Sequence, residues 1–369
     1  MSVPRGLQTD RWLFLATVAL CLLGAVMVFS SSAMTAREQF GSSYHFLLRQ
    51  VLWLAVGLAG MLGLMNLDYR KFRQPSFLFT GMFVVLVLLV SVFFLDRSHA
   101  THRWIRVGPA SLQPSELAKL VVIFFLAWFL ELRRRPPSFG INHWHRTLLP
   151  ALGSVLLLVA LVVFEPDLGT AVAICLVAFT IFFAAGLSWT YVGAAGVLSL
   201  AAVGALILDR SYRYERVIAF LNPSADPQGH GFQLLQSLIA VGSGGFTGVG
   251  LMESKQKLFY LPEASSDFIF AVICEELGFL GAAFVLALFA VYGWRGIRAA
   301  LRAQDDFGRF VAVGITAMVV SQALINVGVV LGMMPTKGIP LPFISYGGSS
   351  LVVMLLATGV LLNISQQTD

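Results

Sequence analysis

The chain is poor in charged residues. Only 12% of its 369 residues are Asp, Glu, Lys or Arg, and 57% are hydrophobic, whereas a typical soluble domain is about 25% charged. Apolar runs of about 20 residues, each long enough to cross a hydrocarbon core of about 30 Å, recur throughout. These runs are continuously apolar rather than alternating, which excludes a transmembrane barrel and predicts membrane-spanning helices.

The chain also has few cysteines and no common catalytic motif. Cys21, Cys175 and Cys274 all fall in apolar segments, so neither a disulfide framework nor a metal-spaced pair is indicated. No P-loop, HExxH zinc motif or nucleophile elbow occurs. The net charge of +6 needs no nucleic-acid partner, because the retention of basic loops beside anionic lipid explains it.

Ten apolar segments are predicted to span the membrane, which makes the fold an all-α polytopic membrane protein with a single domain over residues 1–369. Thirteen basic residues lie in or beside the predicted connections on one face, against five in the opposite short connections. This bias predicts that the basic face and both termini are cytoplasmic. The predicted spans are 13–33, 46–66, 76–95, 114–132, 147–164, 168–187, 190–208, 268–294, 309–332 and 345–364.

One predicted connection is unusually long. Residues 209–266, between the seventh and eighth spans, form an extracytoplasmic loop, and loops of this length usually have a function. Its apolar stretch 231–251 is followed by glycines and is too short to span, which indicates an interfacial or re-entrant segment.

Acidic residues surround the start of the eighth span, in "YLPEASSDFIFAVICEELGF" (260–279). Asp267 lies at its outer mouth, where Ser265, Ser266 or Asp267 itself could cap the helix, so a capping role and a functional role are both open. Glu275 and Glu276 lie about 12–14 Å further along. Because a charge at mid-helix costs ~2.5–3.5 kcal/mol, we expect an ion pair or a protonated carboxyl there, with a structural or gating role.

Two further groups of residues lie near the same predicted face. Glu116 and Lys119, in "QPSELAKL", share one side of the fourth span, as either a structural ion pair or part of a functional site. Arg103 and Trp104, in the preceding loop "HRWIRVG", suit either a membrane anchor or a lip that binds sugar and pyrophosphate.

Basic residues on the outer face are not explained by topology and would suit an anionic ligand. The long loop supplies several, including Arg216 and Lys257. Lys337 lies in a stretch from Pro335 to Gly348 whose prolines and glycines predict an irregular loop packed on the protein. The polar residues thus gather at the outer ends of several predicted helices, an arrangement that suits a lipid-linked anionic substrate.

Several long motifs, in this order along the chain, resemble the SEDS family of shape, elongation, division and sporulation proteins, which includes FtsW and RodA. The resemblance covers nearly the whole chain and is closer to the cell-division branch, FtsW, than to the elongation branch, RodA. The motifs are "QPSELAKL", "FEPDLGTA", "AFLNPSADPQGHGFQLLQSLIAVGSGGFTGVGL", "YLPEASSDFIFAVICEELGFLG" and "FISYGGSSLVVMLLATGVLLNIS".

The resemblance implies an inner-membrane peptidoglycan glycosyltransferase that polymerises lipid II with a cognate class B penicillin-binding protein and other division proteins. It implies that Asp267 is the family's essential aspartate. It also implies that Arg103 and Trp104 match the arginine and tryptophan of the family's "RRWI"-like loop motif, and that Glu116 and Lys119 match the acid and the lysine of its "PSE-AK" motif. Ser265-Ser266 stands where the family commonly has His-Thr.

We interpret Asp267 as the general base, and Arg103, Lys119, Arg216 and Lys337 as candidates to bind the diphosphate. Glu116 would orient Lys119. A divalent cation, Mg²⁺ or Mn²⁺, could bridge carboxylate and diphosphate, although no ligand spacing establishes one. Two other functions remain open on the sequence: a flippase that moves lipid II across the bilayer, and a non-catalytic scaffold of the division machinery.

Overall fold

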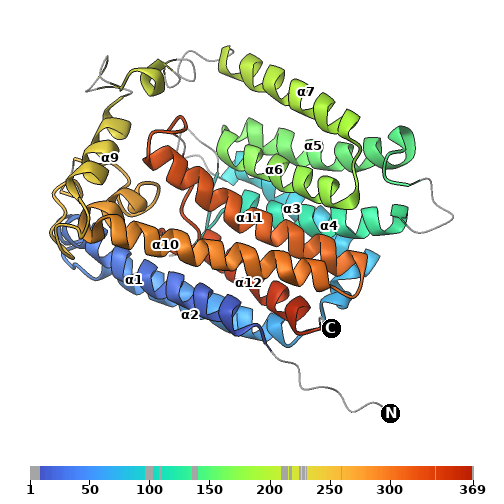
Figure 1. Cartoon of the computed structure of the whole chain (residues 1–369), viewed down its shortest axis with the longest axis horizontal. Coiled ribbons are helices and arrows are strands. Elements are labelled where there is room, and N and C mark those ends of the chain that lie inside the picture. The colour runs from blue at the N-terminus through green and yellow to red at the C-terminus, as the bar shows by residue number, and fades with distance from the viewer. Residues whose placement is uncertain are drawn as a thin grey trace.

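All ten predicted spans are helical in the computed structural model, and most run along the long axis of the molecule (Figure 1). The structure describes residues 9–95, 103–107, 110–134, 140–208, 215, 218–223, 226, 229, 231–258, 260–336 and 338–367. The ten helices are α1 (Arg11–Phe40), α2 (His45–Met65), α3 (Pro75–Leu95), α4 (Pro114–Arg134), α5 (Leu149–Phe164), α6 (Leu168–Ala185), α7 (Trp189–Leu208), α10 (Ile269–Arg302), α11 (Asp306–Val330) and α12 (Gly348–Gln366).

The described residues include eight helices long and apolar enough to cross a membrane, so the protein is membrane-embedded. Helix α4 has the length of a span but holds five acidic or basic side chains, of which Glu116, Lys119 and Glu131 are buried. The fold class predicted from the sequence, a polytopic all-α membrane protein, is confirmed.

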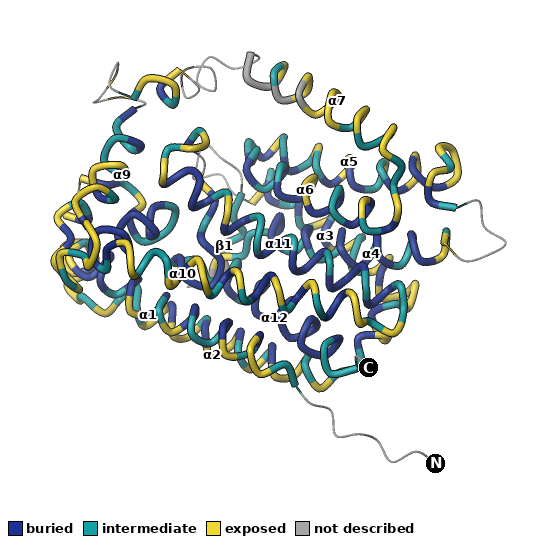
Figure 2. The backbone as a smooth tube through the Cα atoms, in the orientation of Figure 1, coloured by how far each residue is buried: buried dark blue, intermediate teal, exposed yellow. Residues whose placement is uncertain are grey.

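The helices are arranged around α11 and α12, with α1 and α2 on one side and α3 to α6 on the other (Figure 1). Figure 2 shows buried backbone in the middle of the bundle and exposed residues on its outer faces and along α7. Glycines let α2 and α12 approach closely, since a Cβ atom on Gly359 would lie 2.6 Å from the carbonyl oxygen of Met61. Large apolar residues on the outer faces of α2 and α3 suit contact with lipid.

The basic connections meet at one end of the bundle, where ion pairs and hydrogen bonds join them. The described chain begins and ends there, because the Gln366 side-chain amide donates to Thr9 over 3.0 Å. The two termini therefore lie on the same face, as the charge bias predicts. The ion pairs at this end are Arg70–Asp305 (3.3 Å), Arg73–Glu131 (2.9 Å), Arg134–Asp306 (3.0 Å) and Arg295–Asp10 (2.6 Å).

Shorter elements shape the connections. A 3₁₀ turn, η1 (Tyr69–Arg73), and a π turn, η2 (Trp144–Leu148), lie beside α3 and α5. The loop before α4 forms a small antiparallel hairpin of β1 (Ile105–Val107) and β2 (Ala110–Leu112), with Arg106 opposite Ser111, which the sequence did not predict. In the long loop, α9 (Phe232–Ser243) has 12 residues, too few to span a membrane, as expected of the 231–251 stretch.

Replacement of Gly24 in α1 by alanine should destabilise the protein, because the new Cβ atom would lie 2.6 Å from the Phe343 carbonyl oxygen. Overpacking of this kind costs ~1–3 kcal/mol. The matched control is Gly153→Ala in α5, where no atom lies within 4 Å of the position that a Cβ atom would take and where alanine should be neutral or slightly stabilising. Thermal unfolding in detergent measures both variants, and equal melting temperatures would contradict the expected close contact.

Candidate functional site

Asp267 lies in a turn just before α10 and does not form its cap. The helix begins at Ile269, with Phe268 at the N-cap position, so the prediction that Ser265, Ser266 or Asp267 caps the helix is wrong. The turn is closed by the Phe268 amide, which donates to the Glu263 carbonyl over 3.2 Å. Asp267 is half-buried, and a capping role on the helix dipole therefore does not account for its position.

The irregular loop before α12, residues 335–347, holds this turn through backbone carbonyls. The Tyr346 amide donates to the Ser265 carbonyl over 2.9 Å, and the Ser345 hydroxyl donates to the Ser266 carbonyl over 2.5 Å. Because the acceptors are carbonyl oxygens, these bonds do not depend on which side chains precede Asp267. The departure from His-Thr at these two positions therefore leaves the support of the aspartate intact.

Helix α11 supports Asp267 from a second side. The Asn326 side-chain amide donates to the carbonyls of Asp267 and Ile339, each over 2.7 Å. The loop comes so close to the aspartate that a Cβ atom on Gly338 would lie 2.9 Å from Asp267 Oδ2. One amide thus joins the turn to the loop, and the absence of a side chain at Gly338 leaves room for the carboxylate.

The acid and base of α4 form a buried ion pair that contacts the same helix. Lys119 Nζ donates to Glu116 Oε1 over 2.8 Å and to Gln322 Oε1 over 2.8 Å. The Gln322 amide in turn donates to the Pro340 carbonyl over 3.0 Å. Gln322 and Asn326 lie four residues apart on one face of α11, so this face joins the Lys119 pair to the loop that holds Asp267.

Glu116 has a carboxylate oxygen whose hydrogen-bonding capacity is unused. Its Oε2 atom is buried and has no hydrogen-bond partner among the described residues. A buried acceptor without a partner costs free energy, about 1–3 kcal/mol or more for a charged group. The site therefore contains an oxygen that a donor group of a ligand could satisfy.

Arg103 contacts the connection between α5 and α6. It donates to the carbonyls of Glu165, over 3.3 Å, and of Pro166. Asp167 caps α6, because its Oδ1 accepts from the Thr170 amide over 3.1 Å, the simplest role for an aspartate in the short connection between two spans. Asp167 also accepts a bond from Gln113, over 3.0 Å, next to the start of α4.

Glu165 is fully buried at this corner, and neither carboxylate oxygen has a hydrogen-bond partner in the part of the chain that is described. The pKa of Glu165 is raised from 4.5 to about 8, mainly by burial and also by the charge of nearby Asp167, while Arg103 acts in the opposite direction. Glu165 therefore keeps its proton to a higher pH in the folded protein than an exposed glutamate does.

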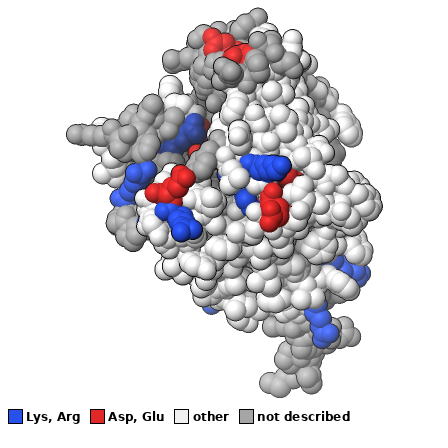
Figure 3. Space-filling view, turned by 90° about the vertical axis from the view of Figure 1, so that its left-hand side faces the viewer, with Lys and Arg blue, Asp and Glu red and all other residues white. Residues whose placement is uncertain are grey.

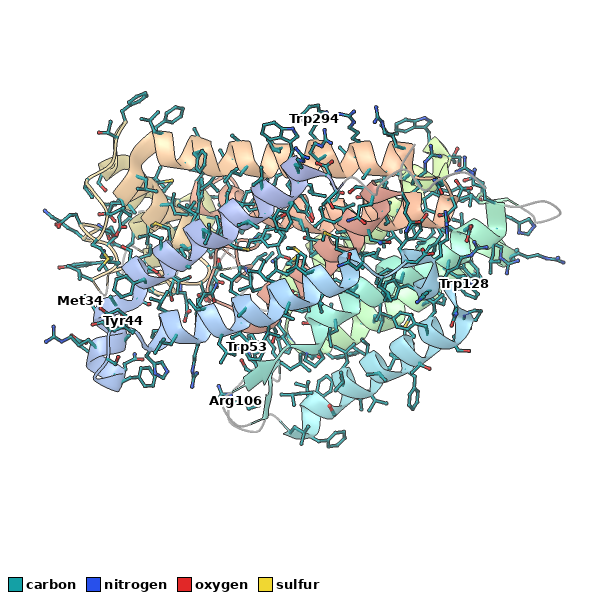
Figure 4. The ribbon with its side chains drawn as sticks, turned by 90° about the horizontal axis from the view of Figure 1, so that it is seen from below. Met34, Tyr44, Trp53, Arg106, Trp128 and Trp294 are labelled. Carbon is teal, nitrogen blue, oxygen red and sulfur yellow. The ribbon has the colours of Figure 1, made fainter. Side chains whose placement is uncertain are left out.

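The remaining predicted residues are dispersed or undescribed. Trp104 is half-buried beside β1, and Arg106 is exposed at the hairpin on the margin of the bundle (Figure 4). Arg216 and Lys337 lie outside the described residues. Figure 3, which views the end of the molecule where α9 lies, shows a few basic and acidic groups gathered near its centre, on a surface of mostly uncharged residues.

Glu275 and Glu276 are both buried in α10, and Glu276 forms the predicted ion pair, with Lys257 Nζ at 2.7 Å. The sequence makes Lys257 a candidate for an anionic ligand, but its side chain is buried against this glutamate. Sequence reasoning also missed Gln322 and Asn326. Two amides four residues apart in the apolar stretch "VVSQALINVG" would have been the signal for a polar face inside the bundle.

The described residues offer no ready site for a metal ion. They contain no group of three His, Cys, Asp or Glu side chains close enough to hold one. A divalent cation at this site would need diphosphate oxygens of a substrate as ligands in addition to carboxylates. No catalytic step is therefore assigned to a metal ion.

Comparisons with known proteins match the chain over nearly its full length. The model of the family of FtsW, RodA and SpoVE proteins, described as "Cell cycle protein", matches residues 11–369. The chain is 44% identical over 360 residues to stage V sporulation protein E of Bacillus subtilis, covering 97% of each chain. It is 42% identical over 357 residues to a probable peptidoglycan glycosyltransferase FtsW of Geobacter metallireducens, covering 96% of this chain and 94% of the other.

Solved structures agree with these matches. The fold superimposes with a TM-score of 0.78 and 32% identity on a chain of a peptidoglycan synthase complex that coordinates polymerization and crosslinking, covering 98% of this chain and 99% of that one. It superimposes on the rod shape determining protein RodA of Thermus thermophilus with a TM-score of 0.71 and 28% identity, covering 99% of this chain and all of the other.

Replacement of Glu165 by glutamine should remove a pH-dependent loss of stability. The folded protein keeps this proton until about pH 8, whereas the unfolded chain releases it near the ordinary pKa of 4.5. The folded state then binds more protons, so stability falls as the pH rises from about 4.5 through about 8. Melting temperatures should be similar at about pH 5 and higher for Glu165→Gln at about pH 8.5.

The exposed Glu253→Gln is the matched control for this comparison, since it removes the same charge from the surface. The melting temperature of Glu253→Gln should change with pH as that of the wild-type protein does. If the melting temperatures of Glu165→Gln and wild type differ by the same amount at about pH 5 and about pH 8.5, Glu165 is already ionised in the folded protein across this range.

Proposed function

Because this chain belongs to the family of FtsW, RodA and SpoVE proteins and is a peptidoglycan glycosyltransferase, we propose that it polymerises lipid II into glycan strands with Asp267 as the general base. In this reaction a sugar hydroxyl of one lipid II attacks the anomeric carbon of another. A base accepts the hydroxyl proton, and undecaprenyl pyrophosphate leaves.

The observation that carries this proposal is the support around Asp267. The turn before α10 is fixed by the Asn326 amide and by the Ser345 hydroxyl, so the backbone on both sides of the carboxylate is held. A general base must lie within hydrogen-bond reach of the proton that it takes, and it contributes typically ~10²–10⁴-fold. Two supports from separate elements meet this demand for a fixed position.

The departing diphosphate needs positive charge nearby. Lys119 is held in place by Glu116 and Gln322, and Arg103 is anchored on the Glu165 and Pro166 carbonyls. Charges that are fixed before the reaction stabilise developing negative charge without reorganisation in the transition state. We assign Lys119 and Arg103 to the diphosphate, Trp104 to the sugar, and Glu116 to the orientation of Lys119. Arg216 and Lys337 remain candidates for the diphosphate on the sequence alone.

The cellular setting follows from the same family membership. We propose that the protein lies in the bacterial inner membrane as a single domain, with both termini in the cytoplasm, and that residues 209–266 face outward. The identities of 44% to a SpoVE protein and 42% to an FtsW protein, against 28% to a RodA protein, support the FtsW and SpoVE side of the family, and from the sequence motifs we propose a role in cell division. The match to a chain of a peptidoglycan synthase complex supports a cognate class B penicillin-binding protein as the crosslinking partner.

Replacement of Asp267 by asparagine should reduce glycan synthesis at least ~100-fold, because asparagine cannot accept the hydroxyl proton. The backbone bonds of the turn do not involve the Asp267 carboxylate, so the variant should fold and insert normally. Polymer formed from fluorescent lipid II by purified protein, with and without the penicillin-binding partner, is the measurement. Glu253→Gln, on the same outer loop, is the control, and near-normal polymerisation by Asp267→Asn would rule out the base assignment.

A further inference from the structure

Helix α10 is interrupted about two and a half turns from its outer end, and the long loop fills the interruption. Gly278 has a non-helical backbone, with φ 64° and ψ −161°. In an unbroken helix the amides of residues 279 and 280 would donate to the carbonyls of residues 275 and 276. Instead, the Phe279 amide donates to Gly245 over 3.0 Å, and the Leu280 amide donates to Phe246 over 3.2 Å.

The carbonyls left over by this break accept from the same loop. The Val249 amide donates to the Glu275 carbonyl over 3.0 Å, and the Gly250 amide donates to the Glu276 carbonyl over 3.1 Å. The two backbones lie so close that a Cβ atom on Gly248 would overlap the Glu276 carbonyl oxygen. The first part of α10, which follows Asp267, is thus hydrogen-bonded into the loop rather than into the rest of its own helix.

Side chains fix this arrangement at the same point. Glu275 accepts from the Ser254 hydroxyl, over 2.5 Å, and from the Lys255 backbone amide, over 3.0 Å. Glu276 pairs with Lys257 over 2.7 Å, and both side chains are buried, at 0% and 4% exposure. The loop therefore brings the neutralising cation to the carboxylate that α10 buries.

A third element, α1, takes part in this pair. The Ser30 hydroxyl lies 2.6 Å from each carboxylate oxygen of Glu276, and Lys257 Nζ donates to it over 3.2 Å. Ser30 is itself buried. Ser30, Lys257 and Glu276 therefore join α1, the outer loop and the outer part of α10 at one buried point, which we call the latch.

We propose that the latch positions Asp267 for catalysis, by locking the outer part of α10 and its loop against α1. The peptide at Gly278 is a natural hinge, because the helical hydrogen bonds across it are missing. With the latch closed, the outer part of α10 has one orientation, and Asp267 at its start has one position. With the latch open, residues 249–258 and the start of α10 can move together, while the Gly245 and Phe246 carbonyls stay bonded to the inner part of α10.

The charge of the latch explains why it stays closed. The two ions are removed from water, and their attraction is strong only when both remain together in the buried site. If either partner is removed alone, the other is left as an uncompensated buried charge, which is strongly destabilising. Latch residues do not touch the reacting atoms; they act through the position of Asp267, so this proposal rests on the assignment of Asp267 as the base.

The test uses the full-length protein with its partner, fluorescent lipid II, and two variants of the latch. Lys257→Met should reduce kcat by about 10- to 100-fold, since small displacements of a catalytic group have effects of this size, while KM for lipid II changes less than about 2-fold. The double variant Lys257→Met/Glu276→Gln removes the uncompensated charge, so its melting temperature should recover while kcat stays low.

Two controls separate positioning from stability and from total charge. Lys257→Arg keeps the ion pair and should retain most of the activity. Lys255→Met removes the same charge from an exposed side chain two residues away, whose backbone alone contacts Glu275, and should leave kcat unchanged. Wild-type kcat in either Lys257→Met or the double variant would overturn the proposal.

Hydrogen exchange of the backbone amides tests the latch independently of turnover. In Lys257→Met and in the double variant, exchange in residues 249–258 and 261–268 should be faster than in wild type, while α11 is unchanged. Unchanged exchange in these segments would overturn the latch even if activity fell. A third outcome separates the two proposals. If Asp267→Asn is active and the latch variants still exchange faster, the base assignment fails, while the latch is shown to hold the loop.

Discussion

A polar group inside a bilayer must find its partner within the protein, and this constraint shapes the whole outer half of the molecule. Unsatisfied backbone groups and unpaired charges cost several kcal/mol each in a hydrocarbon environment. The interrupted helix α10 meets the constraint only because the loop donates Val249 and Gly250 amides to its free carbonyls and accepts from Phe279 and Leu280. The loop therefore supplies the hydrogen bonds that a continuous helix would make to itself. These bonds hold the start of α10, which follows Asp267, in place.

The same constraint gives α11 its role in the site. A polar face of Gln322 and Asn326 in an apolar helix is stable only when both amides are bonded, and the loop 335–347 supplies carbonyls to both. One helix face thereby connects the Lys119 ion pair to the turn of Asp267. A carboxylate and a fixed cation on a single rigid support suit the proposed reaction, in which a proton is removed while a diphosphate departs.

Much of the fold follows from the sequence because the signals are local. Apolar length determines the ten spans, the i,i+3 spacing predicts the pair of Glu116 and Lys119, and "PDLGT" predicts the Asp167 cap. Lys257 and Ser30 could not be predicted as partners of Glu276, because they come from a loop without periodicity and from a helix more than two hundred residues away. The break at Gly278 was also hidden, since "EELGFLG" between apolar residues is typical of a continuous helix.

The two ends of the bundle satisfy their polar groups differently, and this difference bears on the choice between polymerase and transporter. At the end where the described termini lie, the buried Glu131 of α4 pairs with Arg73, and the half-buried Arg133 lies over the Phe129 ring. Apart from atoms of Glu131 and Arg133, the buried side-chain atoms that have no hydrogen-bond partner among the described residues lie at the opposite end, in the helix halves nearer to Asp267 or in the loops there. They are atoms of His45, Gln50, Ser115, Glu116, Glu165, Gln256, Ser321 and Asn326.

A transporter needs a polar route that opens to both faces, so unused donors and acceptors would be expected along its whole length. Among the described residues the unused capacity gathers in the half of the bundle that holds Asp267 and Lys119. Glu116 Oε2 is the sharpest case, since a carboxylate oxygen that is buried without a partner is more stable with a donor group bound. The distribution of unsatisfied polar atoms thus favours a reaction at one end of the bundle over passage through it.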